Sequence, residues 1–422
     1  MSTEPTRRSL HQAPTAAEIS QLHQEHAREV SDRAETAGRS ILRMFGKKAF
    51  GVPGTLLGAV QIPETRTRFT RLGEWHFWWQ AHLLDCAIDA SLRAHREMDS
   101  ATATTWFETA QAILRGIHTR NLGSWTNSYF DDMAWLALAS GRLNALAEIL
   151  NGRGLIQAQD AGRDLFVALS KGATTDLGGG MFWSTQKDFK NTPATAPAAL
   201  AFARGAQVGR ASALLNWLDT KLWDAERKVY LDGIKIRQDS EELESALYSY
   251  NQGPVLSALL EVAEADGELN FEVNQRISDI LDGIEQHFTA TFEVSAVERV
   301  KVLSTHGDGD GGLFSGILAR YLAHVALSEQ VAEEVRSRAS ALVVQSADIL
   351  WEGRREFDPD LPLNEYGIDV REVRGEPTVL FSTDIVRHAS ETLGVGTPVQ
   401  LSSQLQGWML LESAARVLAA SA

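Results

Sequence analysis

The sequence predicts an all-α fold in which paired helices close into a ring. Apolar residues recur at three- and four-residue spacing along almost the whole chain, as on the buried face of a helix. Strand-like alternation is scarce and short. Segment 75–90 is apolar on most sides, as helices enclosed by other helices are, and Gly-rich loops separate the helical segments. These observations favour helical hairpins arranged in a closed ring.

The helical pattern breaks into segments that we expect to be separate helices. Ser212 and Thr383 have side chains typical of helix N-caps and are expected to begin two of them. The best strand candidate is 228–236, expected to form a hairpin that turns at Asp232 and Gly233. The predicted helices are 16–44, 75–97, 105–119, 131–139, 143–150, 160–170, 198–206, 212–223, 253–265, 272–289, 312–327, 330–351 and 383–418.

The chain of 422 residues contains no internal linker rich in Pro, Ser or charge, so a single domain is expected. We expect that domain to span 16–422 and to follow a flexible tail at 1–15. Segment 358–377 is charged and irregular, which favours a long surface loop over a domain boundary.

Composition excludes several classes of function. The formal net charge of −15 argues against a nucleic-acid backbone or an anionic membrane as partner, because both are negatively charged. The single cysteine, Cys86, excludes an internal disulfide and a cysteine-based metal cage. No window approaches the roughly 18 apolar residues of a membrane span. Arg7 and Arg8 are not followed by an apolar segment, so no export signal is predicted and a cytoplasmic location is expected.

Two adjacent carboxylates, Asp131 and Asp132, lie inside the apolar and aromatic stretch 127–135. Burying ionised carboxylates is costly, and no Lys or Arg lies within several residues to neutralise them. Mutual repulsion separates the two pKa values, which suits an enzyme that needs one ionised and one protonated carboxyl group. The alternative is that one aspartate caps a helix while the other is solvated.

Three further segments combine glycine, aromatic and polar residues. In 177–183, glycines let the backbone approach a ligand and Trp183 offers a stacking face; the alternative is a turn with a core tryptophan. Tyr250, Asn251 and Gln252 offer a stacking face, donors and acceptors at the start of a helix, unless the tyrosines of 248–253 pack inward.

The third segment, 305–314, looks like a calcium loop but lacks the third acidic position and the distant glutamate, so no metal is expected there. Its Asp308 and Asp310 either cap a helix or bind sugar hydroxyls. The eleven histidines show no His-Glu-x-x-His pattern, which gives a zinc site little support.

Six segments, in order, make the chain resemble glycoside hydrolase family 76, the endo-acting α-1,6-mannanases. The resemblance implies an (α/α)6 barrel with an open cleft, Asp131 as nucleophile, Asp132 as general acid/base and no cofactor. It implies α-1,6-linked mannan or manno-oligosaccharide as substrate, and adds Tyr129, Trp135, Lys190 and Asn191 to the binding residues. The segments are 129–135, 178–183, 188–192, 230–233, 250–253 and 310–321.

The chemistry of the pair agrees with this resemblance. Adjacent side chains on a helix diverge by about 100°, so two carboxylates can flank one glycosidic bond. Retaining hydrolysis requires carboxyl groups roughly 5 Å apart, which neighbouring residues can reach. Two alternatives are a sugar epimerase or isomerase on the same kind of barrel, which favours a histidine pair, and a mannan-binding protein without turnover. Many relatives are exported, and the missing export signal leaves the natural substrate open.

Overall fold

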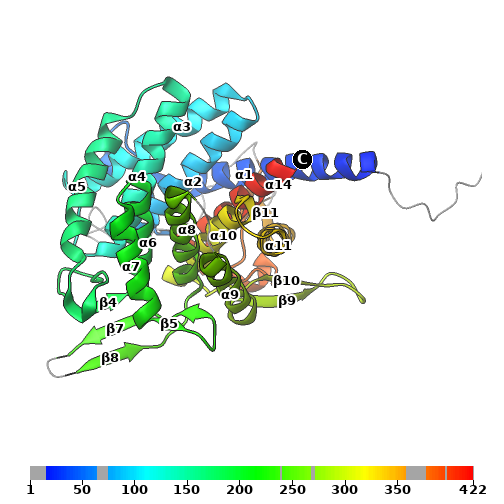
Figure 1. The fold of residues 1–422 in the computed structure, drawn as a ribbon. Helices are drawn as coiled ribbons and strands as arrows, with labels where there is room; N and C mark the ends of the chain where they lie inside the picture. Colours follow the sequence, from blue (N-terminus) through cyan, green and yellow to red (C-terminus); the bar gives the residue numbers. More distant parts are fainter. Residues whose placement is uncertain are drawn as a thin grey trace, which may run out of the picture.

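The computed structural model describes residues 16–63, 75–237, 240–267, 271–357, 377–394 and 397–421. Its described helices form a double ring, with six inner and six outer helices (Figure 1). Each inner helix packs against the next, and the last packs back against the first. The inner helices are α2 (Phe77–Arg96), α4 (Phe130–Asn151), α6 (Thr192–Arg204), α8 (Ser249–Asp266), α10 (Phe314–Leu327) and α14 (Leu401–Ser421).

Five outer helices each follow an inner helix in the chain and pack against it as the other half of a hairpin, and the sixth, α1, packs against α14. The outer helices are α3 (Ser100–Arg120), α5 (Ile156–Gly172), α7 (Val208–Lys221), α9 (Phe271–His287), α11 (Glu333–Glu352) and α1 (Ala16–Phe45). The last pair joins the two ends of the chain, because α1 covers α14. This closed arrangement is the (α/α)6 barrel that the sequence predicted.

Burial explains which helices lie inside. Every residue of α6 from Thr192 to Ala203 is buried, and so is every residue of α14 from Leu401 to Ala415. The outer helix α1 buries only one stripe, as an amphipathic helix at a surface does, and its N-terminal end extends beyond the barrel (Figure 1). Within the described ranges, no helix combines the length and apolar character that a membrane crossing requires.

Short strands occupy the loops between helices, and all their pairings are antiparallel. The three-stranded sheet β4-β7-β8 and the hairpin of β9 and β10 are the most prominent (Figure 1). The strands are β4 (Phe189–Asn191), β7 (Gly233–Ile236), β8 (Glu241–Glu244), β9 (Thr289–Glu293), β10 (Arg299–Leu303), and the pairs β1 (Gly46–Lys47) with β2 (Leu57–Gly58), β3 (Gln61–Ile62) with β13 (Val399–Gln400), β5 (Trp223–Asp224) with β6 (Val229–Tyr230), and β11 (Arg355–Phe357) with β12 (Thr378–Leu380).

Several predicted boundaries were wrong. Segments 131–139 and 143–150 form one helix, α4, because packing on both sides of Gly141 outweighs the roughly 1 kcal/mol that glycine costs in a helix. Ser212 lies inside α7 and donates to the carbonyl of Val208, four residues back, so it is not the N-cap. The hairpin predicted in 228–236 does not turn at its centre, since β6 pairs with β5, and β7 with β4 and β8.

The segment predicted as one helix over 383–418 is the largest error. Thr383 precedes only the short helix α13 (Ala389–Thr392) and the strand β13, and α14 begins at Leu401. Pro398 lies just before β13 and restricts the backbone of the residue before it, which opposes a helix through this segment. The predicted tail 1–15 and most of the predicted loop 358–377 lie outside the described residues.

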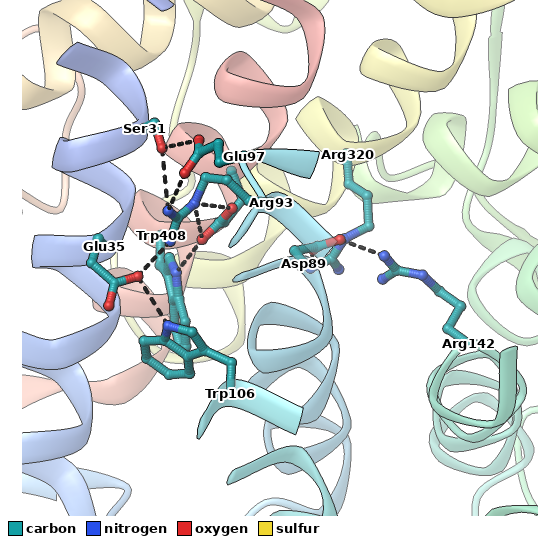
Figure 2. Close-up of polar contacts among 10 residues, drawn as sticks. Ser31, Glu35, Asp89, Arg93, Glu97, Trp106, Arg142, Arg320 and Trp408 are labelled. Atoms are coloured by element: carbon teal, nitrogen blue, oxygen red, sulfur yellow. Dashed lines mark hydrogen bonds and ion pairs between the residues drawn. The ribbon is translucent and has the colours of Figure 1, made fainter. Parts of the chain in front are cut away.

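A buried charge network ties α1 to the barrel where the ring closes (Figure 2). The Arg93 guanidinium donates to Glu35 of α1 at 2.7 Å and to Glu412 of α14 at 3.1 Å. Trp106 and Trp408 donate their indole N–H groups to the same two carboxylates. Buried carboxylates need such partners, because an unpaired charge in the interior is strongly destabilising.

Candidate active site

A cavity of about 950 Å³ opens at one end of the barrel. Most of its wall comes from residues just before, or within the first turns of, five inner helices, so the N-terminal ends of these helices meet there. Loop residues such as Trp183 and Asp232 complete the wall. The volume lies near the top of the range for small-molecule sites, about 300–1,000 Å³. The wall consists of Trp75, His76, Phe77, Trp78, Asn121, Asn127, Tyr129, Asp131, Asp132, Trp135, Trp183, Phe189, Asn191, Pro193, Asp232, Tyr248, Tyr250, His306, Asp310, Gly311 and Phe314.

Asp131 and Asp132 both lie in the first turn of α4, at the wall of this cavity. Neither of them caps the helix, since the N-cap is Tyr129 and its side chain makes no capping bond. Free backbone N–H groups give a helix N-terminus a partial positive charge, which favours a carboxylate placed there. The alternative in which one aspartate is merely a helix cap is therefore wrong.

The two carboxyl groups have unequal surroundings. Asp131 accepts two hydrogen bonds of 2.9 Å, one from the backbone amide of Asp132 and one from the indole Nε1 of Trp183. Asp132 accepts one side-chain hydrogen bond, from the amide of Asn127 at 2.5 Å. Asp131 therefore has more donors to stabilise its ionised form.

These surroundings separate the two pKa values. Both side chains touch solvent only through the recessed cavity, and burial raises the pKa of Asp131 to about 7, against the effect of its two hydrogen bonds. Burial also raises the pKa of Asp132 well above its ordinary value, and the adjacent charge of Asp131 raises it further. Asp131 ionises first, and its charge then keeps Asp132 protonated.

The loop that supplies Trp183 is held by a buried lysine. The Lys190 ammonium donates to the carbonyls of Asp176 at 2.7 Å and Gly179 at 2.5 Å, and also to the carbonyls of Thr174 and Gly180. Gly180 has a φ of +76°, and a Cβ there would lie 2.4 Å from the Trp217 ring. The glycine and the lysine therefore fix the path of the chain toward Trp183.

Aromatic rings cover the other sides of the cavity. Tyr250 stacks on Phe314 with ring centroids 4.0 Å apart, and Trp78 lies 6.4 Å from Tyr250. Trp183 packs against Tyr129 at 5.0 Å and keeps 37% of its surface exposed. Exposed and half-buried rings beside carboxylates are the usual means of holding a sugar ring, because its C–H faces are apolar and its edges carry hydroxyls.

The structure brings together most of the predicted site residues. Trp135, Asn191 and Asp310 join the residues already described in the cavity wall, and Asp310 accepts a 2.8 Å hydrogen bond from the Trp79 indole. Asp308, at the N-cap of the short 3₁₀ turn Gly309–Leu313, is not part of that wall.

Lys190, Asn251 and Gln252 lie behind the wall. Gln252 is fully buried and bonds the backbone of Tyr230 in both directions, at 2.9 and 3.0 Å. Asn251 is buried next to Asp232 and lowers the pKa of that carboxyl group. These three side chains support the site from behind.

Sequence reasoning missed several polar wall residues, among them Asn121, Asn127, Asp232, His76 and His306. Asp232 follows β6, and burial raises its pKa to about 6. Asn127 and Asp232 both lie in segments that the sequence had marked, so proximity to those motifs was an available signal. His76 stacks on Trp79 at 4.3 Å and His306 contacts Ser249 at 3.0 Å. No spacing pattern in the sequence brings those two histidines together.

Known proteins share both sequence features and the fold of this chain. The sequence model of glycosyl hydrolase family 76 matches residues 29–360, more than half of the chain. The fold is similar to that of the α-1,6-mannanase of Salegentibacter sp. HEL1_6, with 23% identity, a TM-score of 0.68, and coverage of 92% of this chain and 99% of that one. Comparison with curated proteins gave no match.

Two further solved structures share the fold. One is an inactive variant of the same Salegentibacter enzyme, with two consecutive aspartates replaced by asparagine, in complex with α-1,6-mannotriose (22% identity, TM-score 0.69, 92% and 99% coverage). The other is a family 76 mannosidase from Bacteroides thetaiotaomicron (15% identity, TM-score 0.69, 93% and 99% coverage). The match over 29–360 assigns the chain: it belongs to glycosyl hydrolase family 76 and is a glycoside hydrolase.

Proposed function

We propose that the protein is an endo-acting α-1,6-mannanase that retains the anomeric configuration. The observation that carries this proposal is the unequal pair of Asp131 and Asp132 in the wall of a large cavity with aromatic sides. The solved Salegentibacter enzyme, named an α-1,6-mannanase, is inactive when two consecutive aspartates are replaced, and it binds α-1,6-mannotriose in that form. Asp131 and Asp132 are the consecutive aspartates of this cavity.

In the first step, the Asp131 carboxylate attacks the anomeric carbon as the bond to the leaving oxygen breaks. Asp132 donates its proton to that oxygen, and a glycosyl ester forms on Asp131. The Trp183 indole and the Asp132 amide hold the attacking carboxylate in place through both of its oxygens. The separation of the two pKa values supplies one base and one acid at the same pH.

In the second step, the Asp132 carboxylate accepts a proton from a water molecule as that water attacks the glycosyl ester. The ester bond breaks, Asp131 is regenerated as a carboxylate, and the product has the α configuration of the substrate. The cavity of about 950 Å³, open to solvent and lined on several sides, suits a segment inside a polymer and therefore endo cleavage.

The direct test measures reducing ends released from α-1,6-linked mannan or a manno-oligosaccharide, with α-1,2- and α-1,3-linked oligosaccharides as linkage controls. We expect release from the α-1,6 linkage, and none from any substrate with Asp131→Asn. Asp188→Asn is a matched control, because Asp188 is exposed and lies outside the cavity wall. If reducing ends were released only from another linkage, the proposed substrate would be wrong, while the assignment as a glycoside hydrolase would stand.

The epimerase or isomerase alternative favours a histidine pair, and His76 and His306 do line the cavity. The His76 ring stacks on Trp79, and the His306 ring contacts Ser249. Both histidines therefore have packing partners within the wall. The family assignment decides for hydrolysis. Incubation with free mannose, followed by sugar analysis, should show no interconversion.

A further inference from the structure

A second cavity, of about 550 Å³, lies at the opposite end of the barrel. Its wall comes from the C-terminal halves of α2, α6 and α14, the middle of α4, and one residue of α5. The active-site cavity lies at the N-terminal ends of α2 and α6, so the two cavities lie toward opposite ends of these helices. Helix α4 lines both, with Trp135 in the wall of the active-site cavity and Ala137 in the wall of the second cavity. Nothing in the hydrolytic mechanism uses the second cavity.

Positive charge is concentrated in this second cavity. Its wall contains the guanidinium groups of Arg96, Arg142, Arg204 and Arg416, but only two carboxylates, Asp89 and Glu412. The whole chain carries a formal net charge of −15, so a cavity with a positive excess runs against the overall composition. Guanidinium groups at one cavity are the usual means of binding a phosphate or carboxylate group.

The two carboxylates in the wall already have partners. Asp89 accepts from Arg142 and from Arg320, the latter at 2.9 Å, and Glu412 accepts from Arg93 at 3.1 Å (Figure 2). The pair of Arg93 and Glu412 is buried, and the pairs of Asp89 with Arg142 and Arg320 are partly buried. Asp89 and Glu412 therefore form their hydrogen bonds with other arginines, and they act on Arg96 and Arg416 only through longer-range attraction.

Arg96 and Arg416 make no hydrogen bond or ion pair with any residue in the described part of the chain. Arg96 and Arg416 are exposed, and partial desolvation together with the neighbouring Arg142, Arg96 and Arg204 lowers the pKa of Arg416 to about 10. Arg204 has one partner, Glu261, at 2.7 Å. The wall thus presents two unpaired guanidinium groups to one cavity. They lie close enough to the other arginines of the wall to be repelled by them.

Helix dipoles explain only part of this cluster. Arg96 and Arg204 are the last residues of α2 and α6, where a positive charge favours the helix C-terminus. Arg142 lies in the middle of α4, and Arg416 lies more than a turn before the described end of α14 at Ser421. Since the dipole effect is confined to the last turn, it does not account for Arg142 and Arg416.

We propose that this second cavity binds a small dianion, of the phosphate monoester class, through Arg96 and Arg416. Two unpaired guanidinium groups match a ligand with two negative charges. One side of the cavity is apolar, with Leu92, Leu138 and Phe166, and this side would cover the uncharged part of an organic ester. The volume lies within the range of about 300–1,000 Å³ typical of small-molecule sites.

Isothermal titration calorimetry of the full-length protein tests this proposal at low ionic strength. The probes are inorganic phosphate and mannose 6-phosphate, with mannose and sodium chloride as uncharged and monovalent controls. We expect one site per chain for both phosphates and none for the controls. Tighter binding of mannose 6-phosphate would identify an organic ester as the ligand, and equal binding would identify free phosphate.

Arg416→Gln and Arg96→Gln should each weaken phosphate binding at least about tenfold, because each removes a charged hydrogen-bond donor. Arg416→Lys keeps the charge and serves if the glutamine variant does not fold; it should bind with intermediate affinity. Arg163→Gln, at an exposed arginine of α5, is the matched control and should bind as the wild type does. Hydrolytic activity should be unchanged in all four variants.

The melting temperature gives an independent measure. Without phosphate, Arg416→Gln should be at least as stable as the wild type, because a crowded positive charge is removed. With phosphate, only the wild type and Arg163→Gln should gain stability, since a ligand stabilises the folded state that binds it. No heat of binding, or the same affinity in both glutamine variants as in the wild type, would overturn the proposal.

Discussion

The indole Nε1 of Trp183 donates a 2.9 Å hydrogen bond to Oδ2 of Asp131, the carboxylate that attacks the sugar in the proposed mechanism. A residue from the loop before β4 thus contacts the first turn of α4, 52 positions earlier in the chain. The sequence suggested Trp183 as a stacking face for a sugar. The structure adds a second role, in which Trp183 orients the nucleophile and favours its ionised form.

Trp183→Phe should therefore move the acidic limb of the kcat/KM profile to higher pH. The indole hydrogen bond lowers the pKa of Asp131, so its loss raises that pKa, and a nucleophile must be ionised to react. The profile on α-1,6-oligomannoside measures the shift. Trp223→Phe is the control, because Trp223 lies in β5, away from the cavity. An unshifted limb with weaker binding would leave stacking as the only role of Trp183.

Asp131→Asn should abolish turnover of every substrate, because nothing replaces the covalent step. Asp132→Asn should lower kcat about 10²–10⁴-fold on a sugar leaving group, which requires a proton from the acid. It should affect the first step far less with an activated aryl mannoside. Mass spectrometry of Asp132→Asn with that substrate should find the glycosyl ester on Asp131. An ester on Asp132 in the Asp131 variant would reverse the two roles.

Asp132→Asn should also raise the melting temperature at neutral pH. The folded pKa of Asp132 is raised, so the folded protein binds more protons than the unfolded chain between the two pKa values. The contribution of Asp132 to the free energy of unfolding is fully present below the unfolded pKa and is lost as pH rises through this window. Asparagine stays neutral, so the variant does not undergo this loss. We therefore expect the free energy of unfolding of Asp132→Asn to exceed that of the wild type at neutral pH, because the variant has no buried group that must ionise.

Thermal unfolding from acidic to neutral pH measures this gain. It should shrink as pH falls, because the carboxyl group is then protonated in both states. Asp188→Asn, at an exposed aspartate, should show no such trend. A destabilised Asp132→Asn at neutral pH would mean that Asp132 is stabilised in its ionised form.

Lys190→Met should destabilise the protein and raise KM. The ammonium group holds four backbone carbonyls of the loop before Trp183, and losing it leaves buried acceptors unpaired at about 1–3 kcal/mol each before relaxation. Chemical denaturation measures the loss, and Lys187→Met, at an exposed lysine nearby, should be neutral. Wild-type stability with weakened oligosaccharide binding would instead make Lys190 a sugar ligand.

The barrel was predictable because inner helices are apolar nearly all round and outer helices along one stripe, a pattern that survives in sequence. The start of α14 could not be predicted, because the apolar spacing of the segment after Thr383 fits a continuous helix. In the structure, Pro398 and the pairing of β13 with β3 interrupt that helix. The two-residue strands were too short to show alternation.

Within the site, the sequence located the right segments and sometimes the wrong side chains. In β4, Phe189 and Asn191 line the cavity while Lys190 between them faces away, because successive side chains of a strand point to opposite faces. In α8, Tyr250 lines the cavity, and Asn251 and Gln252 turn about 100° and 200° around the helix. A motif locates a stretch of chain, and the local period decides which members face the ligand.

Proton NMR of α-1,6-linked mannan during the first minutes of hydrolysis tests the central claim most directly. Two successive displacements at the anomeric carbon, first by Asp131 and then by water, predict that newly formed reducing ends appear as the α anomer and convert to β only by mutarotation. Initial release of the β anomer would contradict the double displacement, and would require a water molecule between carboxyl groups that lie farther apart.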